Sequence, residues 1–406
     1  MNVSKQVQYL LKKGAVIHSP SSIYIEPSVD LKRISPAITI HPGCRITGSM
    51  TSIGPGSVLG EEGPVTIANC QLASKVTLKG GSFSGAVMMT GVTFGPCAHV
   101  RDGTLLEEQV TCAHSVGLKQ TILMPYVTLG SLINFCDCLM AGGKDRKNHG
   151  EVGSSYIHFN YTPHQDKATA SLIGDVPRGV MLDQSPIFLG GQGGLIGPAR
   201  IEYGTIIAAG TIYRKDVLEQ GKLVFGTGSR TAGEAHYDPA CYGDISRILA
   251  NNFIYIGNLH ALYHWHNHVR RLFSMNDQFD RACHEGAVNV LQAILHERIK
   301  QLNVLAENIS RSLETAIHKY GKNLPDQPYG LHKRFIKQWP KLAASLEYDA
   351  NSELDHGRLL KFLTDIGKKP KASYLDAIKN LSPETKSNGT LWLQSVVDSI
   401  TARCIS

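Results

Sequence analysis

A six-residue repeat runs through the first half of the chain and constrains its fold more than any other feature. Each unit contains an aliphatic residue, a small residue, two turn residues, a second small residue and a free position. Clear copies are IEPSV (25–29), IHPGCRI (40–46), IGPGSVL (53–59), FGPCAHV (94–100), IGPARI (196–201) and IAAGTI (207–212). Gly and Pro recur too often for an amphipathic helix. The repeat therefore indicates short strands separated by tight corners.

Three such units make one triangular coil, with the aliphatic residues pointing inward. A coil cannot bury its apolar face alone, so coils must stack, and about 18 residues per coil gives about eleven coils. We expect a mainly β protein with an α-helical addition. Residues 1–22 form an N-terminal cap with a helix near 4–11, residues 23–230 form a left-handed parallel β-helix, and residues 231–406 form an α-helical domain.

Composition restricts the classes of partner. The formal net charge is +7 over 406 residues, and the basic residues do not form long blocks. This pattern favours phosphate-bearing small molecules over nucleic acid. No stretch approaches the ~18 apolar residues of a membrane span, and the N-terminus lacks the apolar core of a signal peptide. The nine irregularly spaced cysteines fit free thiols. We expect a cytoplasmic protein with no membrane span.

The C-terminal region has helical periodicity. Residues 244–272 and 285–320 are expected to form helices, and Ser382-Pro383-Glu384 has the pattern of a helix N-terminus. His260, His264 and His268 recur at four-residue spacing and share one helix face. A metal or pH-sensing cluster is one interpretation, and polar packing is the favoured one. Cys136 and Cys138 are likewise better explained as packed thiols than as a metal pair.

Two segments, 141–151 and 176–186, interrupt the repeat, and such insertions tend to gather on one face of a solenoid. The densest polar cluster lies beside them, between residues 148 and 175. It contains His149, His158 and His164, and histidine is the natural general base for an amine or hydroxyl. The alternative is a histidine that satisfies backbone groups at a crowded corner.

Arg101 and Lys119 lie eighteen residues apart, so in coils of that length they would stack on one face. Two stacked cations make a phosphate clamp. The alternative is two solvated charges on a strand. The glycine-dense segment 190–194 is either a corner where a ligand approaches the backbone or a plain tight turn.

Three segments in order carry a family resemblance: RDGTLLEEQVTCAHSVGLKQTILMPYVTLGSL (101–132), FNYTPHQDK (159–167) and IFLGGQGGLIGPARIEYGTIIAAGTIYRKDV (187–217). They resemble the acetyltransferase half of the bifunctional bacterial UDP-N-acetylglucosamine pyrophosphorylase/glucosamine-1-phosphate acetyltransferase. The resemblance covers the solenoid, about half of the chain.

The resemblance implies roles for individual residues. Arg101 and Lys119 match residues that hold the sugar phosphate. Asn160 and Tyr161 match a pair between the sugar and the acyl-CoA, and Lys167 of the same loop is a further substrate-binding candidate. The remaining matches, Gly191, Ala208 and Ala209, correspond to the wall along which the CoA arm runs. The resemblance also implies a homotrimer with sites between subunits.

One departure affects the chemistry. Where the family has its catalytic histidine in a Gly-His-Leu context, this chain has Gly130-Ser131-Leu132, and Asn134 replaces a tyrosine. A serine hydroxyl does not take up a proton near neutral pH. We therefore name His149 first, and then His158, as candidates for the catalytic base.

The resulting hypothesis is a transferase that uses acetyl-CoA or another acyl-CoA and acts on a sugar phosphate or nucleotide sugar of the UDP-N-acetylglucosamine type, without a metal. One alternative is a catalytically altered nucleotide-sugar-binding or scaffold protein. Another is a pyrophosphorylase-related protein without the nucleotidyltransferase domain, but the acidic pair and glycine-rich loop of that reaction are missing from the sequence.

Overall fold

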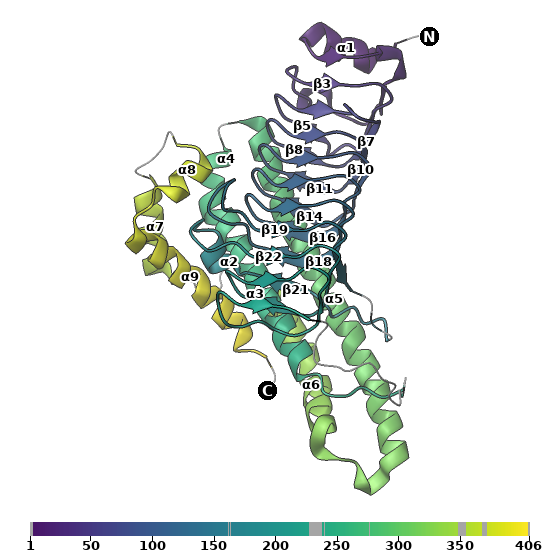
Figure 1. The fold of residues 1–406 in the computed structure, drawn as a ribbon, viewed down its shortest axis with the longest axis vertical. Helices are drawn as coiled ribbons and strands as arrows, with labels where there is room; N and C mark the ends of the chain where they lie inside the picture. Colours follow the sequence, from purple (N-terminus) through teal and green to yellow (C-terminus); the bar gives the residue numbers. More distant parts are fainter. Residues whose placement is uncertain are drawn as a thin grey trace.

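Short parallel strands stack in three rows, and each row forms one face of a three-sided solenoid (Figure 1). The computed structural model describes residues 3–160, 162, 164–226, 238, 240–275, 277–347, 355–367 and 372–404. The solenoid is a left-handed parallel β-helix of about eleven turns, followed by a helical region. The predicted fold class is thereby confirmed.

The first face is a sheet of eleven strands, one from each turn, and all of its pairings are parallel. Its strands, in order along the solenoid, are β1 (Val16–Ile17), β3 (Thr39–Ile40), β6 (Val58–Leu59), β9 (Thr77–Leu78), β12 (Thr93–Phe94), β15 (Thr111–Cys112), β17 (Thr128–Leu129), β19 (Glu151–Val152), β22 (Phe188–Leu189), β25 (Ile206–Ile207) and β27 (Leu223–Val224). Because β1 pairs with β3, the solenoid begins before residue 23, the predicted boundary.

The second and third faces share one sixteen-stranded sheet. The second face contains β2 (Tyr24–Ile25), β4 (Arg45–Thr47), β7 (Val65–Ala68), β10 (Gly81–Ser84), β13 (Ala98–Val100), β16 (Gly117–Leu123), β18 (Asn134–Met140), β20 (Ile157–Phe159), β23 (Gly194–Ile196) and β26 (Ile212–Tyr213). The third face contains β5 (Ser52–Ile53), β8 (Gln71–Leu72), β11 (Ala86–Met88), β14 (Thr104–Leu106), β21 (Ser171–Ile173) and β24 (Arg200–Ile201).

Two long strands join these faces. The first residues of β16 pair with β13 on the second face, and its last residues pair with β14 on the third. In β18 the corner residue is Asp137, whose φ of 58° lies in the left-handed region. Cys136 and Cys138 therefore lie on different faces, and both thiols are buried. All nine cysteines are free, as the sequence predicted.

A short helix caps the first turn of the solenoid. Helix α1 (Lys5–Lys13) begins at Ser4, whose hydroxyl accepts a hydrogen bond from the backbone N–H of Val7. Val7 and Leu10 are buried on its inner side. A solenoid needs such a cap because its terminal coil would otherwise expose its apolar face. The helix expected near residues 4–11 is confirmed.

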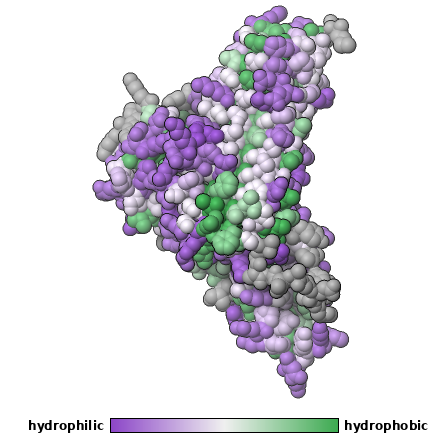
Figure 2. Space-filling model, in the orientation of Figure 1, coloured by the Kyte–Doolittle hydropathy of each residue, from purple (hydrophilic) through white to green (hydrophobic). Residues whose placement is uncertain are grey.

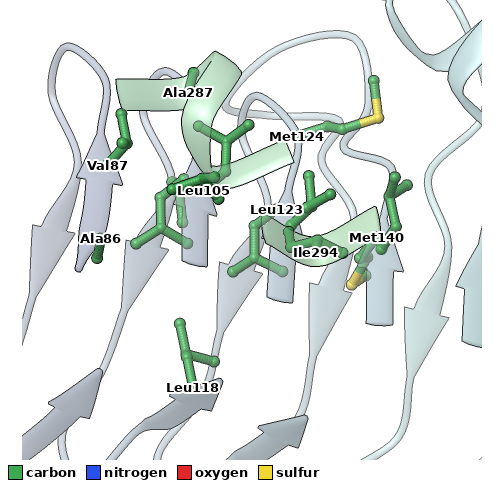
Figure 3. Packing of buried hydrophobic residues seen from close by; sticks show 14 of the residues in the cluster. Ala86, Val87, Leu105, Leu118, Leu123, Met124, Met140, Ala287 and Ile294 are labelled. Carbon is green, nitrogen blue, oxygen red and sulfur yellow. The ribbon is translucent and has the colours of Figure 1, made fainter. Parts of the chain in front are cut away.

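Helix α5 (Gln278–Tyr320) lies along the third face. Its Ala287 and Ile294 lie over the strands that carry Val87, Leu105 and Leu123 (Figure 3). Gly286 permits this approach, because a Cβ there would lie 2.4 Å from Gln71 Oε1 and 2.9 Å from Val87 Cγ2. The helix thus packs on its own solenoid as ordinary core.

One other helix arises from a solenoid insertion, and the remaining helices build the rest of the C-terminal region. They are α2 (Val176–Gly179), which arises from a solenoid insertion, and then α3 (Ser246–Trp265), a π-helical turn (His266–Arg270), α4 (Arg271–Ser274), α6 (Asp326–Ser345), α7 (His356–Gly367), α8 (Tyr374–Lys379) and α9 (Pro383–Thr401). Helix α9 begins at Ser382, as the sequence predicted. On the face shown in Figure 2, the part formed by α7 to α9 is mostly hydrophilic, whereas the solenoid is paler and includes apolar patches.

The histidine face of α3 is part of the core. His260 and His264 are 3% exposed, and His260 Nε2 bonds to the carbonyl oxygen of Leu346 at 2.9 Å. Burial lowers the pKa of His260 to about 4. The rings of His264 and His268 stack, with centroids 5.9 Å apart. These contacts support the polar-packing interpretation.

Candidate functional site

The second face carries the two cations that the eighteen-residue spacing pointed to. Strand β13 pairs with β16 so that His99 faces Gly117. One residue further, the backbone N–H of Arg101 donates to the carbonyl of Leu118 at 2.8 Å. Arg101 and Lys119 therefore occupy equivalent positions on adjacent coils, about 4.8 Å apart along the solenoid. The predicted stacking is confirmed.

Neither cation has a carboxylate within ion-pair distance in the part of the chain that the structure describes. Both cations instead affect the pKa of the Cys136 thiol. Cys136 pairs with Lys119 in the strand of the next coil. Burial raises the pKa of the Cys136 thiol and Asp137 adds to the rise, whereas Arg101 and Lys119 oppose it. No carboxylate of the described residues therefore neutralises the positive charge at this place.

A second feature lies at the corner between the first and second faces. The register of the first face places His114, Ser131, Ser154, Gly191 and Ala209 at equivalent positions on five successive coils. We call these five residues the corner column. Four of its members have small side chains, so the corner is narrow over this length. The predicted CoA-wall residues Gly191 and Ala209 are thereby aligned with the serine that replaces the family's histidine.

Coil stacking itself requires the glycines of this corner. A Cβ on Gly190 would lie 2.3 Å from the backbone nitrogen of Ala209. A Cβ on Gly191 would lie 2.7 Å from the carbonyl oxygen of Ser154. Ala208 lies beside them, opposite Gly190. The glycine-dense segment thus has a structural reason for its composition, and a ligand running along it stays a prediction.

Sequence reasoning missed one pair in the corner column. The Ser131 hydroxyl lies 2.8 Å from His114 Nδ1, at hydrogen-bond distance. The backbone N–H of Ser131 donates to Ser154 Oγ at 3.1 Å, which fixes this turn. His114 is exposed, whereas Ser131 is half-buried. The signal was the histidine in CAHSV, but it stands seventeen residues before Ser131, one short of the assumed coil length.

His158 is buried among polar groups, as is typical of a histidine with a structural role. Its side chain is 2% exposed, and both ring nitrogens have partners: Nδ1 at 2.5 Å from the carbonyl oxygen of Cys136 and Nε2 at 2.7 Å from Ser171 Oγ. Burial lowers the pKa of this imidazole. No ring nitrogen is left for a substrate, so the geometry favours the alternative of a histidine that satisfies polar groups at a corner.

His149 lies at a different corner. It precedes β19, whereas Ser154 of the corner column follows that strand, and five extended residues span roughly 17 Å. Its Nδ1 lies 3.4 Å from the carbonyl oxygen of Gly150. In the same insertion Arg146 donates to the backbone carbonyls of Gln109 and Tyr126. The structure therefore does not bring His149 together with Arg101 and Lys119.

Asn160 directly follows β20, at the end of that strand on the second face. Its Nδ2 donates to Asp137 Oδ2 at 3.0 Å, and Asp137 Oδ1 accepts from Arg298 Nη2 of α5 at 2.5 Å. Arg298 is 2% exposed. Asn160 is thus held by a buried network two coils beyond Lys119. Its predicted partner Tyr161 lies outside the described residues.

The loop after Asn160 contacts the helical region. The Tyr242 hydroxyl donates to Asp166 Oδ2 at 2.6 Å, and the rings of Tyr242 and His164 stack with centroids 4.1 Å apart. Lys167 is exposed, with a φ of 50°. The loop is therefore fixed mainly by the helical region, and a substrate contact by Lys167 stays a prediction.

Neither a side-chain cluster suited to a metal ion nor a membrane-spanning helix is found among the described residues. Within those ranges, no group of three or more His, Cys, Asp or Glu side chains is arranged to hold a metal ion. No helix in the described part of the chain combines the length and apolar character needed to cross a bilayer.

Comparisons with curated proteins identify relatives of the solenoid. No family model matches the chain. The bifunctional protein GlmU of Pelobacter propionicus is 30% identical over 209 residues, which are 51% of this chain and 40% of that protein. GlmU of Trichlorobacter lovleyi gives the same values, and GlmU of Nitratidesulfovibrio vulgaris is 26% identical over 54% of this chain and 43% of its own. This chain thus spans about two fifths of these relatives.

Solved structures give weaker matches. LpxA from Acinetobacter baumannii is 15% identical with a TM-score of 0.26, covering 50% of this chain and 68% of that one. The UDP-N-acetylglucosamine O-acyltransferase (LpxA) from Moraxella catarrhalis is 15% identical with a TM-score of 0.23, covering 48% and 66%.

The solenoid defines the class: the chain resembles the hexapeptide-repeat acyltransferases. Within that class its similarity is to GlmU, over the acetyltransferase region. The resemblance inferred from three sequence segments is confirmed.

Proposed function

We propose that this protein is an acyltransferase that uses an acyl-CoA and acts on a sugar phosphate or nucleotide sugar. The observation that carries the proposal is the placement of Arg101 and Lys119, without carboxylate partners among the described residues, on the face next to the corner column. The cations would hold a phosphate through charge-assisted hydrogen bonds. Within one coil Lys119 follows His114 by five residues, at most about 17 Å of chain. The phosphate held by Lys119 and the corner would therefore lie on the same coil of the solenoid.

The corner column would guide the acyl-CoA. Its small residues Ser154, Gly191 and Ala209 leave room for an extended chain beside the backbone. Backbone N–H groups at such a corner would stabilise the oxyanion of the tetrahedral intermediate, and this stabilisation usually accelerates acyl transfer more than any other single effect. Acetyl-CoA is the first thioester to test, and a longer acyl group is the alternative. The acceptor is of the UDP-N-acetylglucosamine or aminosugar-phosphate type.

We further propose a homotrimer in the cytoplasm. Helices cover the third face, which leaves the first and second faces for contacts between subunits. Exposed apolar side chains lie on both of these faces, among them Ile157 and Phe159 on the second and Phe188 and Ile206 on the first. Light scattering during size exclusion should give three times the chain mass. A monomer at micromolar concentration would contradict this part of the proposal.

The test of function is acyl transfer by the full chain. Acetyl-CoA is mixed with aminosugar phosphates or nucleotide sugars, and thiol release and product mass are followed. Transfer to one acceptor is the expected result. No turnover, together with no CoA binding by calorimetry, would contradict the proposal. Tight nucleotide-sugar binding without CoA binding would instead favour the scaffold alternative, which the serine at position 131 motivates.

A further inference from the structure

The corner column changes character at one end. From Ala209 through Gly191, Ser154 and Ser131 the side chains are small, and the next coil then presents the imidazole of His114. An acyl chain lying along this corner would therefore meet its first titratable group at His114. Successive coils are about 4.8 Å apart. The imidazole thus lies one coil from Ser131, the position where the sequence resemblance puts the family's catalytic histidine.

The contacts of His114 leave one ring nitrogen available. Nδ1 is at hydrogen-bond distance from Ser131 Oγ, and no described residue lies within hydrogen-bond distance of Nε2. When Nδ1 carries the proton and donates it to the serine oxygen, Nε2 has a free lone pair. The serine then fixes both the ring orientation and its tautomer, as the hydrogen-bond partners of catalytic and metal-bound histidines do.

We propose that His114 is the general base of the acyl transfer and that Ser131 positions it. This inference rests on the proposed function. Nε2 removes a proton from the acceptor hydroxyl or amine as that group attacks the thioester carbonyl. The new O–C or N–C bond forms, the C–S bond breaks, and the CoA sulfur leaves with the proton from Nε2. One imidazole thus accepts the proton and then returns it, so protons and charges balance without a further reactant.

His114 fits this role better than His149 and His158, the two histidines named from the sequence as candidate bases. His158 is buried and has a partner on each ring nitrogen. His149 lies at the opposite end of the first-face strand from the corner column. His114 alone among these three adjoins both the corner column and the second face. Since Lys119 belongs to the same coil, a phosphate held there and the base would act on one acceptor.

The experiment compares matched asparagine variants of the full chain. Asparagine at position 114 keeps an amide near the position of Nδ1 but has no titratable nitrogen. His114→Asn should lower kcat by about 10²- to 10⁴-fold, the usual contribution of a general base. Acetyl-CoA and acceptor affinities measured by calorimetry should stay within about twofold, because the base makes no ground-state charge contact. His149→Asn tests the other candidate base, and His318→Asn, at an exposed position of α5, is the control that should leave kcat unchanged.

Ser131→Ala tests the positioning role separately. Loss of the hydrogen bond should shift the pH profile of kcat and lower its maximum, with little change in KM. Turnover of the unmodified chain that survives in His114→Asn would overturn the inference alone. A loss confined to His149→Asn would also overturn it. An unmodified chain that neither turns over nor binds acetyl-CoA would overturn the proposed function, and the inference with it.

Discussion

The second and third faces of the solenoid come from the same coils but have different outward side chains. On the third face these residues are apolar and buried: Val87, Leu105, Ile122 and Leu139. On the second face they are polar or exposed: His99, Arg101, Lys119 and Asn134. The repeat specifies the inward positions of both faces alike. The outward positions differ because helices contact the third face and not the second. Of these two faces, the second is therefore the one available for a ligand.

The largest expected effect concerns the ion pair between α5 and the corner joining these faces. Arg298→Ala leaves the buried Asp137 without its guanidinium partner and should destabilise the fold by about 3–5 kcal/mol. The measurement is the urea midpoint followed by circular dichroism. The control is Lys300→Ala on the exposed side of α5, expected within about 0.5 kcal/mol. A loss below about 1 kcal/mol in Arg298→Ala would mean that Asp137 is not held by this pair.

A matched pair of truncations tests the contrast between the faces directly. Leu105→Ala removes a fully buried side chain under α5 and should cost about 2–5 kcal/mol. Ile157→Ala removes an outward side chain on the second face, 38% exposed, and should change stability by about 0.5 kcal/mol or less in the single chain. If both variants lost the same free energy of unfolding in urea, either the third face would not be the one covered by helices, or a partner would cover the second face.

Sugar-phosphate binding should depend on the second face and not on the third. Lys119→Ala should weaken sugar-phosphate binding about 10- to 100-fold, because a hydrogen bond to a charged group contributes about 1.5–3 kcal/mol. Its urea midpoint should not change. Lys79→Ala, which removes a surface lysine paired with Glu62, is the control for charge. Calorimetry that finds equal affinities in both variants would show that Arg101 and Lys119 are solvated charges.

The smallest effect is a pH dependence that belongs to the helical cover. Burial lowers the pKa of both His260 and His284 to about 4, whereas the unfolded chain has the ordinary value near 6.5. Below pH 6.5 the unfolded state therefore binds more protons, and stability falls as the pH drops toward 4. From pH 7.5 to 5.5 each ring should account for about 1 kcal/mol. His260→Gln should flatten this slope in thermal melts, and an unchanged slope would contradict the assignment.

The fold could be predicted because the repeat is local: six residues define a strand and its corner without knowledge of distant contacts. The cation pair followed because its two coils have the assumed length. The His114–Ser131 pair did not, since the first-face register steps from Thr93 to Thr111 to Thr128 and so shortens by one residue. A fixed period cannot show where such a step occurs.

The packing of helices on the third face was not predicted, for a different reason. Its signal was present in the runs AVM (86–88) and SLI (171–173), which are buried on both sides, unlike the alternating strands of the other faces. Those runs indicate a covered face only once strands are assigned to faces. Contacts such as Arg298 with Asp137 join residues far apart in sequence, and no local pattern specifies them.

Helix α5 has a consequence for how the molecule comes apart. In a plain solenoid each turn touches only its neighbours, so turns can peel away one after another. The 43 residues of α5 extend about 65 Å and bridge β5, β8, β11 and β14 before reaching Asp137. Helix α5 thus connects non-adjacent turns, which should unfold together as one cooperative unit. Unfolding should accordingly start at the N-terminal turns formed by β1 to β4, and their backbone amides should exchange hydrogen fastest.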